Sequence, residues 1–268
     1  MKKQSKLISI LITSIMALSL VSCGGSKSDA ILIVGSTSVL PYAEVLAEEY
    51  AVMFPDRKAV DPQGGGTATG IMAVNTGTAD IGMSSRHLKD NEKHLWSVEI
   101  AKDGLAIVVH TDNPVIDLTL NQIRDIYSGK INNWSELGGP DAKIHIIARE
   151  DGSGTRNAFE DLVMKGVDIT PKAIVQNSNG AIRQLVGDDP NSIGFISMEL
   201  VDKTVKAIKL NGVEATCENV INGSYDLYRP FLFVMIDEPQ GQAKQFIDFV
   251  LSPEGQQILV REGLISVI

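Results

Sequence analysis

The chain is poor in the residues that build disulfide frameworks and metal sites. Its 268 residues include two cysteines, Cys23 and Cys217, too few for a disulfide framework or a zinc-binding cluster. The four histidines, at positions 87, 94, 110 and 145, show no metal-binding spacing such as His-Glu-x-x-His. The sequence therefore predicts no metal and no cofactor.

Positive charge is also scarce. Lys and Arg together number 24 against 33 Asp and Glu, which gives a net charge of −9 at pH 7. Together with the lack of a basic tract, this balance argues against nucleic acid as a partner. An anionic ligand would have to be held by local donors against an unfavourable overall field.

A long apolar run occurs only at the amino terminus. Lys2, Lys3 and Lys6 precede residues 7–21, a stretch of fifteen residues without charge. A membrane-spanning helix needs ~20 apolar residues, so this run fits the apolar region of a secretory signal better. We predict a signal peptide over residues 1–22.

The signal ends in Leu20-Val21-Ser22-Cys23, which resembles a bacterial lipobox. That resemblance implies cleavage before Cys23, lipidation of its sulfur (a palmitate-type lipoprotein), and residues 23–30 as a flexible tether. The domain would then sit on the outer face of the cell membrane. The alternative is a plain cleavage site with an incidental cysteine.

One stretch, Arg149-Glu150-Asp151-Gly152-Ser153-Gly154-Thr155, joins an apolar strand to a helical pattern. A helix start presents unpaired N–H groups and the positive end of the helix dipole. Glycines let the backbone close around a ligand, the hydroxyls donate, and Arg149 adds a charged planar fork. These features predict an anion site, although an ordinary capped helix would also explain the motif.

Three more hydroxyl-rich loops follow predicted strands. Two lie at residues 35–41 and 64–70, the second with Gly64-Gly65-Gly66-Thr67, and residues 78–86 form a short strand that ends in the third. No Gly-Lys-Ser/Thr follows these glycines, and the spacing is wrong for a dinucleotide fingerprint. Four such loops in one chain favour a shared ligand over four independent helix caps.

The order of elements predicts an α/β chain with two lobes. Residues 105–109 and 231–236 are strongly apolar strands and are the expected places where the chain crosses between lobes. Residues 31–109 with 231–268 would form lobe 1, and residues 110–230 lobe 2. The hydroxyl loops would then face each other across a cleft that closes by a hinge.

Taken together, these motifs resemble the phosphate-binding lipoprotein of the bacterial high-affinity phosphate ABC transporter, over essentially the whole mature chain. The most specific is Arg149-x-Asp151-Gly152-Ser153-Gly154-Thr155, supported by residues 64–71, 80–86 and 192–195. The resemblance implies a two-lobed type II periplasmic-binding-protein (Venus flytrap) fold with two crossover strands. The family expectation is a monomer.

The resemblance also implies roles for individual residues. Arg149 would be the charged donor and Asp151 its positioning partner. The other implied phosphate-binding residues supply hydroxyl or backbone donors, with a threonine at 67 where the family usually has serine: Thr37, Ser38, Thr67, Ser153, Gly154 and Thr155. Ser85 also faces the site but stands where well-known members carry an aspartate that accepts the proton of phosphate and repels sulfate. Its neighbour Arg86 could approach the cleft or pair on the surface, and we favour the surface position.

The expected function is capture of inorganic phosphate and its delivery to a membrane permease with its ATPase, without catalysis. A receptor for another tetrahedral oxyanion, such as sulfate, is the alternative of the same class, and a sensor that presents its phosphate-bound form to a membrane partner is another. A phosphatase using a serine is a further alternative, against which stands the lack of a Gly-x-Ser-x-Gly motif.

Overall fold

The computed structural model describes residues 30–268. The predicted signal peptide, Cys23 and all of the tether except Ala30 lie outside the described residues. The chain begins with three parallel strands, β1 (Ile31–Gly35), β2 (Val60–Gly64) and β3 (Ile81–Ser84), with β1 in the middle. Helices α2 (Leu40–Met53) and α3 (Thr67–Asn75) connect them.

All but two of the described strands join one continuous sheet, in the order β2-β1-β3-β11-β4-β8-β6-β7, with β9 also paired to β4. The long strand β4 (Trp96–His110) is its centre. Residues 96–104 pair with β11 (Tyr228–Met235), and residues 105–109 pair with β8 (Ser192–Ser197), both antiparallel. The two ends of β4 therefore pair with different strands, in different parts of the sheet.

The remaining strands are β5 (Asp117–Leu118), β6 (His145–Arg149), β7 (Ile174–Gln176), β9 (Val205–Ala207) and β10 (Lys209–Leu210). The α-helices are α4 (Leu120–Ser128), α5 (Gly154–Phe159), α6 (Asn179–Asp188), α7 (Cys217–Ile221), α8 (Gly241–Val250) and α9 (Pro253–Arg261). Short irregular turns of helix are η1 (Asp90–Glu92), η2 (Trp134–Leu137), η3 (Glu160–Met164) and η4 (Met198–Leu200).

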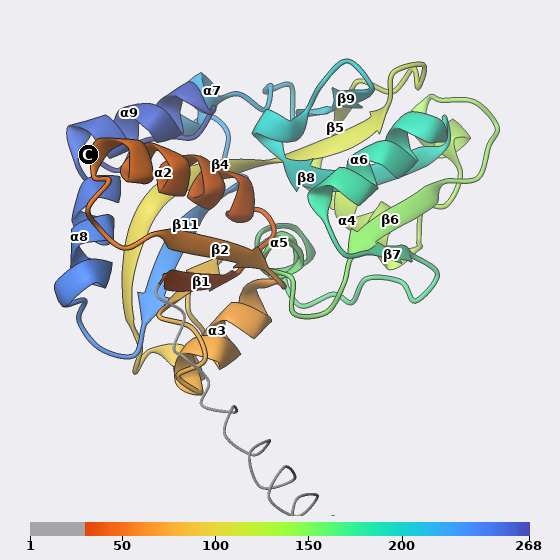
Figure 1. The fold of residues 1–268 in the computed structure, drawn as a ribbon. Helices are drawn as coiled ribbons and strands as arrows, with labels where there is room; N and C mark the ends of the chain where they lie inside the picture. The colour runs from red at the N-terminus through yellow and green to blue at the C-terminus, as the bar shows by residue number, and fades with distance from the viewer. Residues whose placement is uncertain (1–29) are drawn as a thin grey trace, which may run out of the picture.

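Two large hydrophobic cores define two halves of the molecule, which Figure 1 shows as two bodies side by side. The core of the first half is formed from residues 31–101 and 231–264, and the core of the second half from residues 105–227 together with Ile265. In the first half, α2 turns Leu46 and Tyr50 inward against Phe246 of α8. In the second half, the rings of Phe159 and Phe195 stack with centroids 4.1 Å apart. Burial of these apolar side chains stabilises each half.

The predicted crossover strands are present as β4 and β11. Along β4 the core changes between Ala101 and Leu105, and at the start of β11 it changes between Leu227, just before the strand, and Phe231. Residues 105–109 thus pack into the second core, earlier than the expected limit at 109. The exact lobe limits, 31–109 with 231–268 and 110–230, stay a prediction.

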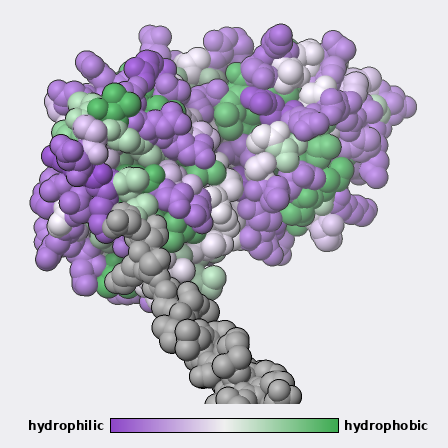
Figure 2. Space-filling model, in the orientation of Figure 1, coloured by the Kyte–Doolittle hydropathy of each residue, from purple (hydrophilic) through white to green (hydrophobic). Residues whose placement is uncertain are grey.

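The described residues contain no helix long and apolar enough to cross a membrane. Figure 2 shows a face covered mostly by hydrophilic residues, with hydrophobic ones in smaller groups between them.

Candidate functional site

The four hydroxyl-rich loops meet between the two halves. Each follows the carboxyl end of a strand: β1 ends at Gly35, β2 at Gly64, β3 at Ser84 and β6 at Arg149. Hydrogen bonds cross from half to half, since Ser38 Oγ lies 2.8 Å from Thr155 Oγ1 and Arg149 Nη2 lies 3.0 Å from Thr37 Oγ1. Residues more than 100 positions apart in sequence therefore share one polar cage.

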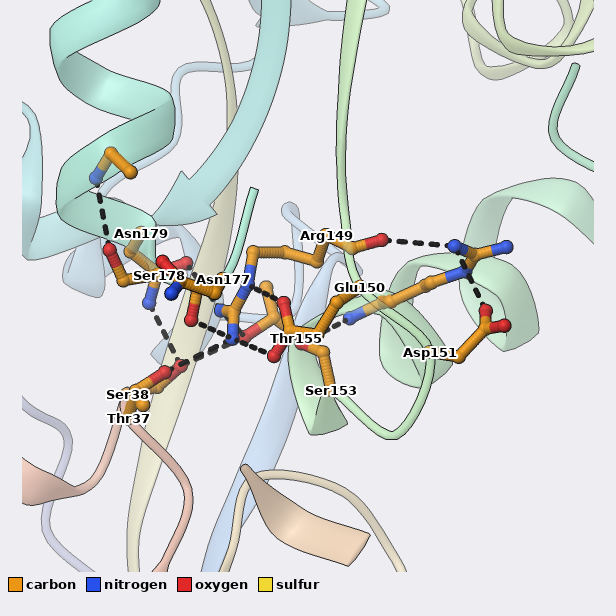
Figure 3. Close-up of polar contacts among 12 residues, drawn as sticks. Thr37, Ser38, Arg149, Glu150, Asp151, Ser153, Thr155, Asn177, Ser178 and Asn179 are labelled. Atoms are coloured by element: carbon orange, nitrogen blue, oxygen red, sulfur yellow. Dashed lines mark hydrogen bonds and ion pairs between the residues drawn. The ribbon is translucent and has the colours of Figure 1, made fainter. Parts of the chain in front are cut away.

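Arg149 lies at the centre of this cage and is 1% exposed. Its Nη1 donates to Thr155 Oγ1 at 3.3 Å and to Asn179 Oδ1 at 3.5 Å, and its Nη2 donates to the Asn177 carbonyl at 3.3 Å. Figure 3 shows the guanidinium pointing at these groups and at Thr37. A buried guanidinium of this kind is a strong donor to an oxyanion.

Glu150, and not Asp151, positions Arg149. The Glu150 carboxylate accepts from Arg149 Nε at 2.8 Å and from Nη2 at 2.9 Å. The expected role of Asp151 is wrong because the chain turns there: Ser153 N donates to the Glu150 carbonyl, and Gly152 has φ +85°. The turn directs Asp151 toward solvent, where its side chain is 94% exposed and pairs with Arg156 at 3.1 Å (Figure 3).

The predicted hydroxyl residues are buried at the site, except Thr37, which is half-buried. Thr67, Ser85, Ser153 and Thr155 are 0% exposed, and Ser38 is 3% exposed. Thr67 Oγ1 accepts from the backbone N–H of Ser85 at 3.2 Å, and Ser153 Oγ caps α5 by accepting from Arg156 N at 3.2 Å. These hydroxyls therefore keep their own protons for other partners.

Gly154 brings the two halves into close contact. A Cβ built on it would lie 2.3 Å from Thr67 Oγ1 and 2.4 Å from Ser85 Oγ, which leaves no room for a side chain. The sequence therefore needs glycine here for close approach and not for an unusual backbone angle.

Helices α2, α3, α5 and α6 all begin at or next to residues of the cage. The first-turn N–H groups of a helix lack partners within the helix and carry partial positive charge. Within residues 30–268, no group of three or more His, Cys, Asp or Glu side chains could hold a metal ion. The arrangement is thus a cage of neutral donors around one arginine, suited to an anion.

The sequence did not identify several residues of this region. Ser36 donates to Ser85 Oγ at 2.9 Å, and Asn179 donates to Ser38 Oγ at 2.8 Å. The pattern Ser178-Asn179-Gly180 before a helical stretch is an N-cap signal that points to a helix start here, and Ser178 Oγ does accept from Ala181 N at 3.1 Å.

The expected surface position of Arg86 is wrong. Arg86 is 4% exposed, pairs with Glu92 at 2.7 Å and donates to Asn157 Oδ1 of the other half at 3.1 Å. Its guanidinium, by hydrogen bonding, lowers the pKa of the Glu92 carboxyl. Burial of Arg86 is tolerated because the Glu92 carboxylate compensates for the loss of hydration of its charge.

A second polar group joins the two halves near the crossover strands β4 and β11. Tyr42 of α2 donates to the Glu199 carboxylate in η4. Close by, Arg229 and Asp103, from the two crossover strands, form a buried pair at 2.8 Å. Burial raises the pKa of Glu199 to about 7.

Comparison with known proteins agrees with this geometry. A family model described as a PBP superfamily domain matches residues 22–254, so the fold and site define a protein of the PBP superfamily, and the predicted fold class is confirmed. The phosphate-binding protein PstS of Bacillus subtilis is 30% identical over 281 residues, covering 97% of this chain and 93% of that protein. The chain belongs to the family of phosphate-binding proteins PstS.

Solved structures agree as well. A Clostridium perfringens protein assigned as a phosphate ABC transporter substrate-binding protein, with bound phosphate, is 48% identical with a TM-score of 0.86. The match covers 89% of this chain and 100% of that one. An ABC-type phosphate transport receptor from Vibrio cholerae is 42% identical with a TM-score of 0.76, covering 88% and 99%.

Proposed function

We propose that this protein captures inorganic phosphate between its two halves and delivers it to the permease and ATPase of a membrane ABC transporter. The observation that carries the proposal is the 1% exposed guanidinium of Arg149 inside a cage of buried hydroxyls. The relatives named above as phosphate-binding and phosphate-transport proteins support the choice of anion.

The proposed phosphate contacts come from both halves, so that binding stabilises the closed form. Arg149 supplies the charge, and hydroxyls or backbone N–H groups supply the remaining donors: Thr37, Ser38, Thr67, Ser85, Ser153, Gly154 and Thr155. Glu150 orients Arg149. No side chain of this set is proposed as a nucleophile or general base, and the protein performs no catalysis.

The proposed location is the outer face of the cell membrane. Residues 1–22 would direct export, and lipidated Cys23 with residues 23–30 would tether a monomer to the membrane. Both features lie outside the described residues, apart from Ala30, and rest on the lipobox resemblance.

Titration calorimetry on the chain from Ser26 onward tests the function. Phosphate should bind tightly, and Arg149→Ala should weaken it by about 30-fold or more, since loss of one member of a buried charged pair costs ~2–5 kcal/mol. Arg183→Ala is a matched control, because Arg183 carries the same charge on α6 but pairs with Asp202 outside the cage.

One observation favours a second candidate, a receptor for sulfate or another tetrahedral oxyanion. Ser85 puts a neutral hydroxyl in the cage, where a carboxylate would repel a fully deprotonated anion. Tight sulfate binding with weak phosphate binding in the same titrations would replace phosphate with sulfate in the proposal.

A further inference from the structure

The cage is rich in groups that can only donate. The guanidinium of Arg149 and the N–H groups at the helix starts have no acceptor atom, and a hydroxyl can rotate to donate or accept. Inorganic phosphate carries at least one proton at neutral pH, whereas sulfate carries none. A cage of donors alone would favour sulfate, so selection of phosphate needs an atom that can only accept.

The nearby carboxylates are committed elsewhere. Both Glu150 oxygens accept from Arg149, at 2.8 and 2.9 Å, and because the Glu150 side chain is 29% exposed, water can reach its remaining lone pairs; Asp151 points to solvent. Ser85 Oγ accepts from Ser36 at 2.9 Å but keeps a proton of its own, so it can meet either form of an anion. None of these groups is both fully buried and able only to accept.

Asn179 offers a fixed acceptor. The residue is 2% exposed, its Nδ2 donates to Ser38 Oγ at 2.8 Å, and its Oδ1 faces Arg149 Nη1 at 3.5 Å. Exchanging the amide oxygen and nitrogen would place N–H groups against the guanidinium N–H groups, so the charge of Arg149 favours the orientation with Oδ1 toward it. The 3.5 Å contact is at the long limit of a hydrogen bond, which leaves Oδ1 only weakly engaged.

The surroundings of Asn179 hold it in place. Ser178 caps α6, with Ala181 N donating to its Oγ at 3.1 Å, so Asn179 is the first residue of a ten-residue helix. In the closed form, Ser38 Oγ and Thr155 Oγ1 lie 2.8 Å apart, and only one of their two protons serves that contact. The other proton is free for an anion next to Asn179 Oδ1.

We propose that Asn179 determines specificity: its Oδ1 accepts the proton of a bound phosphate and repels an anion without a proton. The proposal rests on the proposed function. The same oxygen would favour phosphate and disfavour sulfate. The neutral hydroxyl of Ser85 cannot make this distinction.

The test measures phosphate and sulfate affinities by calorimetry at pH 7 on the protein from Ser26 to Ile268. Asn179→Ala should lower the affinity for phosphate at least tenfold and leave that for sulfate unchanged or higher. Asn179→Asp keeps an acceptor and should retain the preference for phosphate. Ser178→Ala, which removes the α6 cap but not the acceptor, should leave the ratio of the two affinities unchanged.

Three results would overturn the proposal. Equal losses for both anions in Asn179→Ala would show that Asn179 only positions Ser38 and Arg149. Loss of the preference in Ser85→Ala instead would move the role to Ser85. Wild-type protein that binds both anions equally has no selectivity to assign. By contrast, wild-type protein that binds no phosphate would refute the proposed function itself, and thermal unfolding checks that each variant is folded.

Discussion

Gly154 lies where the two halves of the molecule touch, and its replacement by alanine separates closure from folding. The new Cβ would lie 2.3 Å from Thr67 Oγ1 and 2.4 Å from Ser85 Oγ, whereas ordinary contact begins at 3.4 Å. Both clashing atoms belong to the opposite half. With the halves apart the substitution meets no obstacle, and alanine at a backbone angle it can adopt stabilises by ~0.4–1 kcal/mol, because it has fewer unfolded conformations to lose than glycine.

The size of the effect follows from these distances. Relieving the clash moves the halves apart by about 1 Å, the shortfall from van der Waals contact. The Ser38–Thr155 and Arg149–Thr37 hydrogen bonds, now 2.8 and 3.0 Å long, would then be broken. Two hydrogen bonds at ~1 kcal/mol each, with ~1 kcal/mol or more of residual crowding, amount to about 3 kcal/mol. Phosphate affinity should fall by about 100-fold.

Calorimetric titration measures the affinity, and thermal unfolding without phosphate should give an unchanged or higher midpoint. Gly180→Ala is a matched control at the start of α6, because its Cβ would meet only Ser178 Oγ, at 4.0 Å, and it should bind as the wild type does. Wild-type affinity in Gly154→Ala would refute the reasoning, since the halves would then not close to this arrangement when phosphate binds.

Two further predictions concern carboxylates. Glu150→Gln should lower phosphate affinity about tenfold, because a hydrogen bond to a charged group contributes ~1.5–3 kcal/mol to the orientation of Arg149. Asp151→Asn should leave the affinity unchanged in the same titration, and the reverse result would return the positioning role to Asp151. Burial raises the pKa of Glu199 from 4.5 to about 7, so the folded state holds this proton more tightly than the unfolded state, and this group's contribution to stability falls by up to ~3 kcal/mol as pH rises from about 5 to 7. Urea unfolding at the two pH values should show a smaller drop in Glu199→Gln than in wild type, and equal drops would contradict the assignment.

Much of the arrangement could be predicted from local patterns. The glycines and hydroxyl residues that follow predicted strands located the four loops, because the residues that form a turn or a helix start are close together in the sequence. The strands at residues 105–109 and 231–236 were recognised by their continuous apolar character. Nothing local indicates that Asn179, the first residue of α6, reaches Ser38, 141 positions earlier.

The errors come from contacts that depend on the turn or on the opposite half. Asp151 and Glu150 are neighbours, and only the backbone turn at Gly152 decides which of them meets Arg149. A charged residue such as Arg86 is normally exposed, and its burial depends on Glu92 and on Asn157 from the other half. Composition and spacing do not contain that information.

The shared strand β4 has a consequence for how the protein loses its structure. Residues 96–104 complete one core and residues 105–109 the other, on a single uninterrupted backbone. Each half pairs with its own segment of β4, and the two segments meet at residues 101–105, where one core gives way to the other. We therefore expect opening of one half to fray the strand into the other, which couples the two halves in unfolding.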